Sequence, residues 1–279
     1  RLMGLDGGAT AQALGIAGTQ ASGLKSQFGT MCKPFHSGKA SQNGLLAARL
    51  AARGFSSRPD LIECEQGFAA THAPDFHPKK ALAEPPGGFY LHANLFKYHA
   101  ACYMTHAPIE CGRDLREAHG VRPDDIAAMT LSVHRGSSRI CNIPAPTDGL
   151  EAKFSLRQTV AMALSGVDTA SLGAYSVATA TDPALTALRE RIDMDFRDDL
   201  PEAGAELAVN LRDGRVVRAT HDAGIAMDDV AAQGGRLAAK FDALAGPVLG
   251  AARARELRET ILGLDRLGDV GAVMRLAAG

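Results

Sequence analysis

A proline- and glycine-rich stretch at residues 57–90 divides the chain into two parts with different patterns. It holds five prolines and the pair Gly87-Gly88, and both residue types interrupt helices and strands. We therefore place a domain boundary between residues 88 and 89. The chain has 279 residues, close to the length above which single cores tend to split, so two modest domains are expected.

The part before this stretch predicts helices. Residues 1–56 are rich in Ala and Gly, and Leu14, Ala17 and Ala21 recur at helical spacing. Ser37 is a typical N-cap residue, and the stripe that follows it ends at Gly54. We expect a second helix between these two residues.

The part after the stretch mixes strands with helices. Residues 129–134 alternate apolar and polar side chains, which is typical of a half-buried strand. Residues 206–211 and 216–220 predict a hairpin, and Asp213-Gly214 suits a two-residue type I′ turn. Thr105 can cap a helix that runs toward Gly120. Helices are also predicted along Leu156, Val160 and Leu164, after Asp182-Pro183, and in most of the chain beyond Asp228. The irregular order indicates an α+β fold.

Composition narrows the function classes. The net charge is −1, so no overall field attracts nucleic acid or an anionic membrane, and we expect neither as a partner. Five scattered cysteines without a C-x-x-C pair favour reduced thiols and a cytoplasmic protein. No apolar run is long enough to span a bilayer.

The most informative motif is Gly29-Thr-Met-Cys-Lys33-Pro-Phe-His36. Since the residue before a proline is driven to an extended conformation, Lys33 is expected on a loop just ahead of a helix. Open N–H groups at the helix start, with Lys33 and His36, would form a pocket for an anion such as a carboxylate. If burial lowers its pKa, Lys33 could also act as a base or an acid. The alternative is that Lys33 is solvated and His36 packs or caps.

A second motif runs from Lys97 to His106 and includes Cys102. His92, His99 and His106 recur every seven residues, which raises the idea of a metal site. There is no HExxH motif and no paired carboxylate at a fitting offset, so we predict no metal and favour partly buried histidines. A nucleophilic Cys102 would need a base and a third orienting group.

Several strings in this sequence resemble the MmgE/PrpD family. They run in the family's order over nearly the whole chain, and the two most specific are the Lys33 and Ala152-Lys-Phe-Ser segments. The matching strings are Ala13-Leu-Gly-Ile-Ala-Gly18, Gln20-Ala-Ser-Gly23, Gly29-Thr-x-x-Lys33-x-x-His36-x-Gly38-x-Ala40, Lys97-x4-Cys102-x3-His106, Glu151-Ala-Lys-Phe-Ser-Leu156, the Asp213-Gly214 hairpin and Lys240-Phe241.

The resemblance implies a helical domain interrupted by a smaller α+β domain that contains an antiparallel sheet. On this pattern residues 1–88 and 223–279 form the helical domain, residues 89–222 form the inserted domain, and the active site lies in the cleft between them. It also implies homodimers and chemistry without a cofactor on small di- or tricarboxylates.

Position by position, Lys33 matches the family's active-site lysine and Lys97 the lysine at the entrance of the second domain. We assign catalytic roles to Lys33, His36, Lys97 and Cys102. We assign substrate contacts to Gly29, Thr30, Tyr98 and His106.

Two departures from the family pattern matter. Cys102 stands where the family's cis-aconitate decarboxylases carry a catalytic His, which argues against decarboxylation of cis-aconitate. More than a hundred N-terminal residues of the family are absent, so the sequence reads as a fragment or a natural truncation.

The resulting expectation is a metal-free hydro-lyase acting on a hydroxy acid such as 2-methylcitrate. The alternatives are an epimerase or isomerase, a decarboxylase on a related polycarboxylate, and an inactive truncated member.

Overall fold

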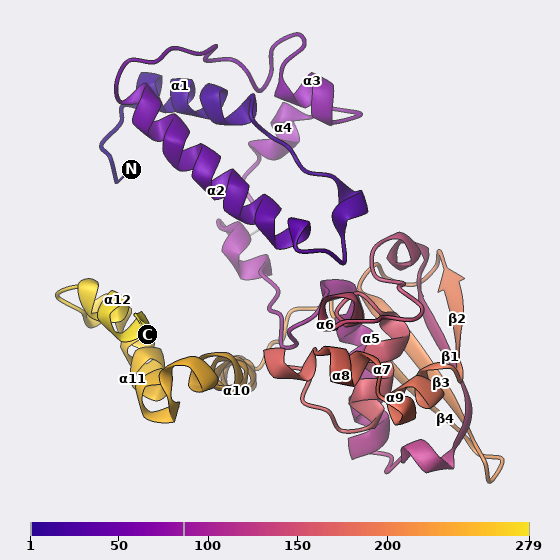
Figure 1. The fold of residues 1–279 in the computed structure, drawn as a ribbon. Helices are drawn as coiled ribbons and strands as arrows, with labels where there is room; N and C mark the ends of the chain where they lie inside the picture. Colours follow the sequence, from indigo (N-terminus) through magenta and orange to yellow (C-terminus); the bar gives the residue numbers. More distant parts are fainter. Residues whose placement is uncertain (1, 86, 279) are drawn as a thin grey trace. The chain divides into compact units, whose positions relative to one another are not determined.

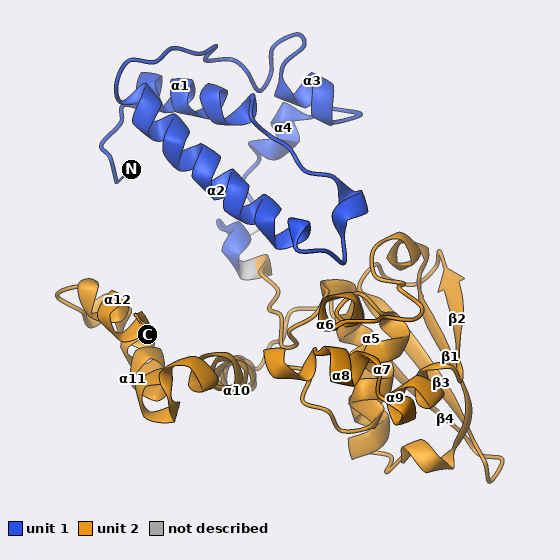
Figure 2. Ribbon diagram, in the orientation of Figure 1, with its two compact units in different colours: residues 1–92 blue, residues 93–279 orange. Residues whose placement is uncertain are grey.

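The computed structural model describes residues 2–85 and 87–278, except for the side chain of His92. The chain folds as two units, Arg1–His92 and Ala93–Gly279, which Figure 2 shows in different colours. Each unit has a core of its own.

Unit 1 is helical and is built on one close helix pair. Ile16 of α1 packs on Ala47 and Ala51 of α2, and such small side chains let the two helices approach closely. Gly15 is needed on α1 because a Cβ there would lie 2.3 Å from the hydroxyl oxygen of Ser57. The helices of this unit are α1 (Gly7–Gly18), α2 (Cys32–Ala51), α3 (Phe68–His72) and α4 (Pro78–Ala81) (Figure 1).

The start of α2 differs from the prediction. Ser37 is not the N-cap, because α2 already begins at Cys32, and Lys33 lies in its first turn and not on a preceding loop. Thr30 supports this early start: its hydroxyl oxygen accepts from the Cys32 N–H at 3.2 Å. Pro34 is tolerated because a first-turn residue needs no intrahelical N–H partner. The helix ends at Ala51, and Gly54 takes a left-handed conformation three residues later.

Unit 2 contains a four-stranded sheet with helices packed on it. Helix α5 packs against β3 and β4, and α7 packs against α5 and α9 (Figure 1). The elements in chain order are α5 (His106–Glu117), β1 (Ile126–His134), α6 (Gly149–Ala152), α7 (Leu156–Leu164), α8 (Val177–Ala180), α9 (Pro183–Arg189), β2 (Ile192–Arg197), β3 (Gly204–Leu211), β4 (Val216–Asp222), α10 (Val230–Leu249), α11 (Ala251–Leu262) and α12 (Gly271–Ala277).

The sheet is mixed and not purely antiparallel. Its strand order is β2-β1-β3-β4; β1 and β2 are parallel, and the other two pairs are antiparallel. The α+β class is confirmed, but sequence analysis missed β2 and with it the parallel pair. Two parallel neighbours need a crossover connection, and α6 to α9 supply it.

The predicted hairpin is confirmed, although its turn is of another type. The Leu211 N–H donates to the Arg215 carbonyl at 2.8 Å, so the loop holds the three residues 212–214. Gly214 alone among them has a positive φ, of 89°, whereas a type I′ turn needs two such residues. This is the three-residue hairpin with glycine in the left-handed position.

Local signals placed two further helices correctly. Leu156, Val160 and Leu164 of α7 are all buried, in agreement with their helical spacing. Asp182 caps α9, since its carboxylate accepts from the Leu185 N–H at 2.9 Å. Thr105 holds the predicted N-cap position of α5, but its side chain makes no capping bond, because the hydroxyl donates to the Cys102 carbonyl at 2.7 Å.

The chain ends in the predicted helices. Helix α10 packs against α11, and the two are joined by an ion pair of Asp242 with Arg258 at 2.6 Å. Across the two described ranges, no helix combines the length and apolar character needed to cross a membrane.

Candidate active site

The segment from Lys97 to Cys102 is held on two sides within unit 2. The Ala100 N–H donates to the Thr169 carbonyl at 2.9 Å, and the Cys102 N–H donates to the Lys153 carbonyl at 3.0 Å. The segment leads directly into α5, which begins at His106. Two candidate catalytic side chains, Lys97 and Cys102, thus lie on backbone that tertiary hydrogen bonds hold in place.

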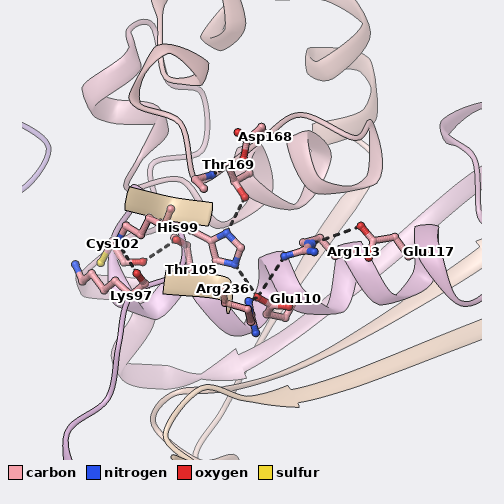
Figure 3. Close-up of polar contacts among 12 residues, drawn as sticks. Lys97, His99, Cys102, Thr105, Glu110, Arg113, Glu117, Asp168, Thr169 and Arg236 are labelled. Atoms are coloured by element: carbon pink, nitrogen blue, oxygen red, sulfur yellow. Dashed lines mark hydrogen bonds and ion pairs between the residues drawn. The ribbon is translucent and has the colours of Figure 1, made fainter. Parts of the chain in front are cut away.

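His99 is the buried centre of this segment. Its Nε2 lies 2.8 Å from Glu110 Oε1, and its Nδ1 lies 2.7 Å from the Thr169 hydroxyl (Figure 3). Burial lowers the pKa of His99 and favours the neutral ring. Because an ionised carboxylate only accepts, Nε2 carries the hydrogen and Nδ1 accepts from Thr169.

Arg236 of α10 completes the network from a distant part of the sequence. Its guanidinium donates to the same oxygen of Glu110 and also lies over the Tyr98 ring, 3.8 Å from the ring centroid. Burial alone would raise the pKa of Glu110. The hydrogen bond from His99 and the charge and hydrogen bond of Arg236 outweigh burial and lower this pKa to about 2. Glu110 is therefore ionised at neutral pH.

His106 is a second buried imidazole, 2% exposed, and its Nε2 has no hydrogen-bond partner within the described part of the chain. Its ring lies 4.9 Å from that of His99 and 5.1 Å from that of Tyr103, measured between centroids. Burial is the main cause that lowers its pKa to about 3, and the charges of Lys97 and Lys240 act in the same direction. His106 is thus neutral at pH 7.

Two lysine ammonium groups lie near these imidazoles. Lys97 Nζ donates to the Ala101 carbonyl at 3.3 Å, and Lys240 Nζ of α10 donates to the Lys97 carbonyl. Burial and the charge of Lys97 both lower the pKa of Lys240. Cations this close to neutral, hydrogen-bonding side chains suit a small anion that carries more than one carboxylate.

A cavity of about 350 Å³ adjoins this cluster. Its wall includes Tyr98 and His106, two of the residues predicted to contact substrate, together with Glu110 and Arg236. Residues 220–223 and 225–227, at the end of β4 and just beyond it, form another side. Lys97 and Cys102 are not part of this wall among the described residues.

The other predicted site residues lie in unit 1. Thr30 is occupied locally: its hydroxyl donates to the Gln27 carbonyl at 2.8 Å, and its carbonyl accepts from the Lys33 N–H at 3.3 Å. The predicted anion pocket of open N–H groups is therefore wrong, because Thr30 takes two of them and Pro34 has none. Gly29 has a φ of 89°, in the left-handed region.

Lys33 and His36 are both half-buried. The Lys33 ammonium lies 5.4 Å from the Phe28 ring centroid. The His36 ring packs on Gly23, where a Cβ would approach it to 3.0 Å. Since these residues belong to unit 1 and Lys97 to unit 2, the idea that both lysines hold one substrate stays a prediction.

Sequence reasoning missed Glu110, Arg236 and Thr169 and gave Lys240 no role. Arg236 and Lys240 are 126 and 143 residues from their partners, so no local pattern connects them. The only available signal for Lys240 was its place in a family-like string. In the described ranges no three His, Cys, Asp or Glu side chains are grouped to hold a metal, and the five cysteines are free thiols.

Models of a known protein family match both parts of the chain. Residues 1–81 match the MmgE/PrpD N-terminal domain, and residues 99–266 match the MmgE/PrpD C-terminal domain. The chain belongs to the MmgE/PrpD family. In this MmgE/PrpD chain the C-terminal match begins at His99 and includes Arg236 and Lys240.

Named relatives of this MmgE/PrpD chain are cis-aconitate decarboxylases. One from Aspergillus terreus is 26% identical over 305 residues, which covers 99% of this chain and 61% of the relative. The human cis-aconitate decarboxylase is 26% identical over 226 residues, covering 77% of this chain and 46% of the relative. The chain thus spans less than two thirds of the length of these relatives.

Proposed function

We propose that this chain is part of a lyase that acts on a small polycarboxylate. The observation that carries the proposal is the pair of ammonium groups, Lys97 and Lys240, beside the neutral imidazole of His106. Cations hold the carboxylates while negative charge develops on the neighbouring carbon. A neutral imidazole can accept a hydrogen bond from the substrate.

Our first candidate reaction is the dehydration of a hydroxy acid such as 2-methylcitrate. A base removes the proton next to a carboxylate, a carbon–carbon double bond forms, and the carbon–oxygen bond breaks. An acid donates a proton to the departing hydroxide, which leaves as water. Lys33, His36, Lys97 and Cys102 are the groups we propose for these proton transfers, with substrate held also by Gly29, Thr30, Tyr98 and His106.

A second candidate is decarboxylation, which the names of the relatives favour. Three relatives that match this chain, two from Aspergillus terreus and one from human, are all cis-aconitate decarboxylases. Here a carbon–carbon bond breaks, carbon dioxide leaves, and an acid protonates the resulting carbanion. Cys102 in place of the histidine implied by the resemblance favours dehydration over this reaction.

The test incubates the chain separately with 2-methylcitrate and cis-aconitate, with and without a chelator. Absorbance of the unsaturated acid reports dehydration, and released carbon dioxide reports decarboxylation. Deuterium exchange from solvent without either product would indicate an epimerase or isomerase instead. Loss of turnover on addition of the chelator would contradict the metal-free proposal.

Variants tie the reaction to this site. Lys97→Ala removes one charge-assisted hydrogen bond, so kcat/KM should fall about 10- to 150-fold. Arg255→Ala, an exposed cation on α11, is the matched control and should leave kcat/KM within about twofold of the unsubstituted chain. Cys102→His should raise carbon dioxide release relative to dehydration. Equal activity of Lys97→Ala and the control would exclude Lys97 from the site.

A further inference from the structure

Helix α10 contacts the Lys97–Cys102 segment directly at two consecutive residues and is linked to the next one, His99, through Glu110. Lys240 donates to the Lys97 carbonyl, and Arg236 covers the Tyr98 ring. Arg236 also donates to Glu110, whose carboxylate accepts from His99. Each of these contacts is made either to the segment itself or to Glu110, which binds His99 of the segment. None of them requires a bound substrate.

The Arg236–Glu110–His99 chain is well shielded from solvent. The exposed fractions of the side chains are 27% for Arg236, 16% for Glu110 and 2% for His99. A largely shielded carboxylate that loses its hydrogen-bonded cation is destabilised, since water can replace that cation only in part. The position of His99 therefore depends on whether Arg236 is in place.

His99 in turn joins the two sides of the segment. It is bonded on one edge to Glu110 of α5 and on the other to Thr169. The Thr169 carbonyl accepts from the Ala100 N–H, one residue along the segment. A shift of the His99 ring would therefore disturb the backbone between Lys97 and Cys102.

We propose that Glu110 and Arg236 are positioning residues that hold the Lys97–Cys102 segment through His99. Arg236 does so from α10, so docking of this helix sets the place of Lys97 and Cys102. The proposal rests on the proposed function only in treating Lys97 and Cys102 as active-site groups.

The chain offers a matched control for the charge beside Glu110. Arg113 also lies near Glu110 Oε1, at 3.8 Å, but it sits on α5 itself and its side chain is 38% exposed. Arg113→Ala removes a cation from the same carboxylate and leaves every contact of α10 with the segment. An effect that is seen only when Arg236 is replaced therefore reports the contact of α10 with the segment, and not merely the loss of a positive charge beside Glu110.

The experiment measures hydrogen exchange of the full chain by mass spectrometry. Arg236→Ala should speed exchange of the Ala100 and Cys102 amides on the order of tenfold, because their hydrogen bonds open more often. The β1 peptide, 126–134, should be unchanged. Arg236→Lys keeps the charge but cannot both stack on Tyr98 and reach Glu110, so an intermediate effect is expected. Arg113→Ala should match the unsubstituted chain.

If Arg236→Ala does not fold, Glu110→Gln provides an alternative test of the same link between Arg236 and His99. It keeps the shape of the side chain and an acceptor for His99, but loses the charge that Arg236 neutralises, and it should also speed exchange at Ala100 and Cys102. Unchanged exchange there in a folded variant would overturn the proposal. So would an equal effect of Arg113→Ala, or faster exchange spread evenly over unit 2.

Turnover supplies the second readout. In an active chain Arg236→Lys should lower kcat more than it raises KM, since it displaces Lys97 and Cys102 without removing either group. If the unsubstituted chain turns over neither polycarboxylate, the proposed function fails, while the exchange result still decides the positioning role.

Discussion

The ring of His106 lies edge-on to the ring of His99, with 4.9 Å between their centroids. Burial lowers the pKa of each imidazole, and that of His106 falls to about 3. The two rings therefore share a buried space in which a proton is unfavourable. Stability and site chemistry are coupled here, because the neutral imidazole proposed for substrate contact is also a group that makes the fold sensitive to acid.

Acid should unfold this chain in a defined pH window. The unfolded chain protonates His106 below its ordinary pKa of 6.5, whereas the folded chain resists protonation down to about 3. The unfolding free energy should thus be fully present above pH 6.5 and fall below it, by up to about 1.4 kcal/mol per pH unit for each such group. His99 acts in the same direction.

Glu110 adds a second window of the same sign, from its ordinary pKa of 4.5 down to about 2. Urea titrations at pH 7.5, 6.5, 5.5 and 4.5 measure the histidine part, and His106→Gln should flatten it. A free energy that stays level between pH 6.5 and 4.5 in the unsubstituted chain would contradict the assignment of neutral, buried rings.

A methyl group at position 149 should be poorly tolerated. A Cβ on Gly149 would lie 2.0 Å from the Tyr175 carbonyl oxygen, which is backbone and cannot swing aside. We expect Gly149→Ala to lower the unfolding free energy by about 3 kcal/mol or more. Gly235→Ala on α10 meets no atom within 4 Å and should be neutral or stabilising by up to about 1 kcal/mol. Similar denaturant midpoints for the two variants would refute the predicted clash.

The buried pair of Gln158 and Arg189 should show strong coupling. Arg189 Nη1 donates to Gln158 Oε1 at 2.7 Å, and Gln158 Nε2 donates to the Thr179 carbonyl at 3.0 Å. Gln158→Leu leaves the shielded guanidinium short of an acceptor and should lower the unfolding free energy by about 3 kcal/mol. Adding Arg189→Met should recover part of this loss. A double-mutant cycle measures the coupling, and purely additive effects would speak against it.

The cysteines should separate by reactivity. Burial raises the pKa of Cys111 to about 12, and both the Cys102 thiol and burial raise that of Cys141. Cys32 is exposed. At pH 7.5 iodoacetamide should therefore label Cys32 at least about a hundredfold faster than Cys111 or Cys141, because the thiolate is the reacting form. Peptide mass spectrometry measures the rates, and unfolding in guanidinium should remove the difference. Rapid native labelling of Cys111 would be inconsistent with its burial.

Elements whose signals are local were predictable. The hairpin around Gly214, the spacing along α7 and the cap at Asp182 each depend on residues a few positions apart, and all three are present. The predicted start of α2 at Ser37 was too late, because Thr30 binds the Cys32 N–H and the helix begins at Cys32. Strand β2 was missed although it alternates, since six residues are a weak signal without knowledge of their partner.

In the candidate site, too, the residues with local signals were predictable and those that depend on distant contacts were not. Residue types and a family-like spacing singled out Lys97, Cys102 and His106, because these groups lie within ten residues of one another. Helical periodicity and turn chemistry likewise specified most of the elements. Glu110, Arg236 and Lys240 acquired their roles only when the chain folded, since α10 meets the segment across more than a hundred intervening residues. The pKa values of His106 and Glu110 also depend on the tertiary structure. They are set by how much water the packed neighbours exclude and by which charges the fold brings close, and the sequence alone gives neither of these.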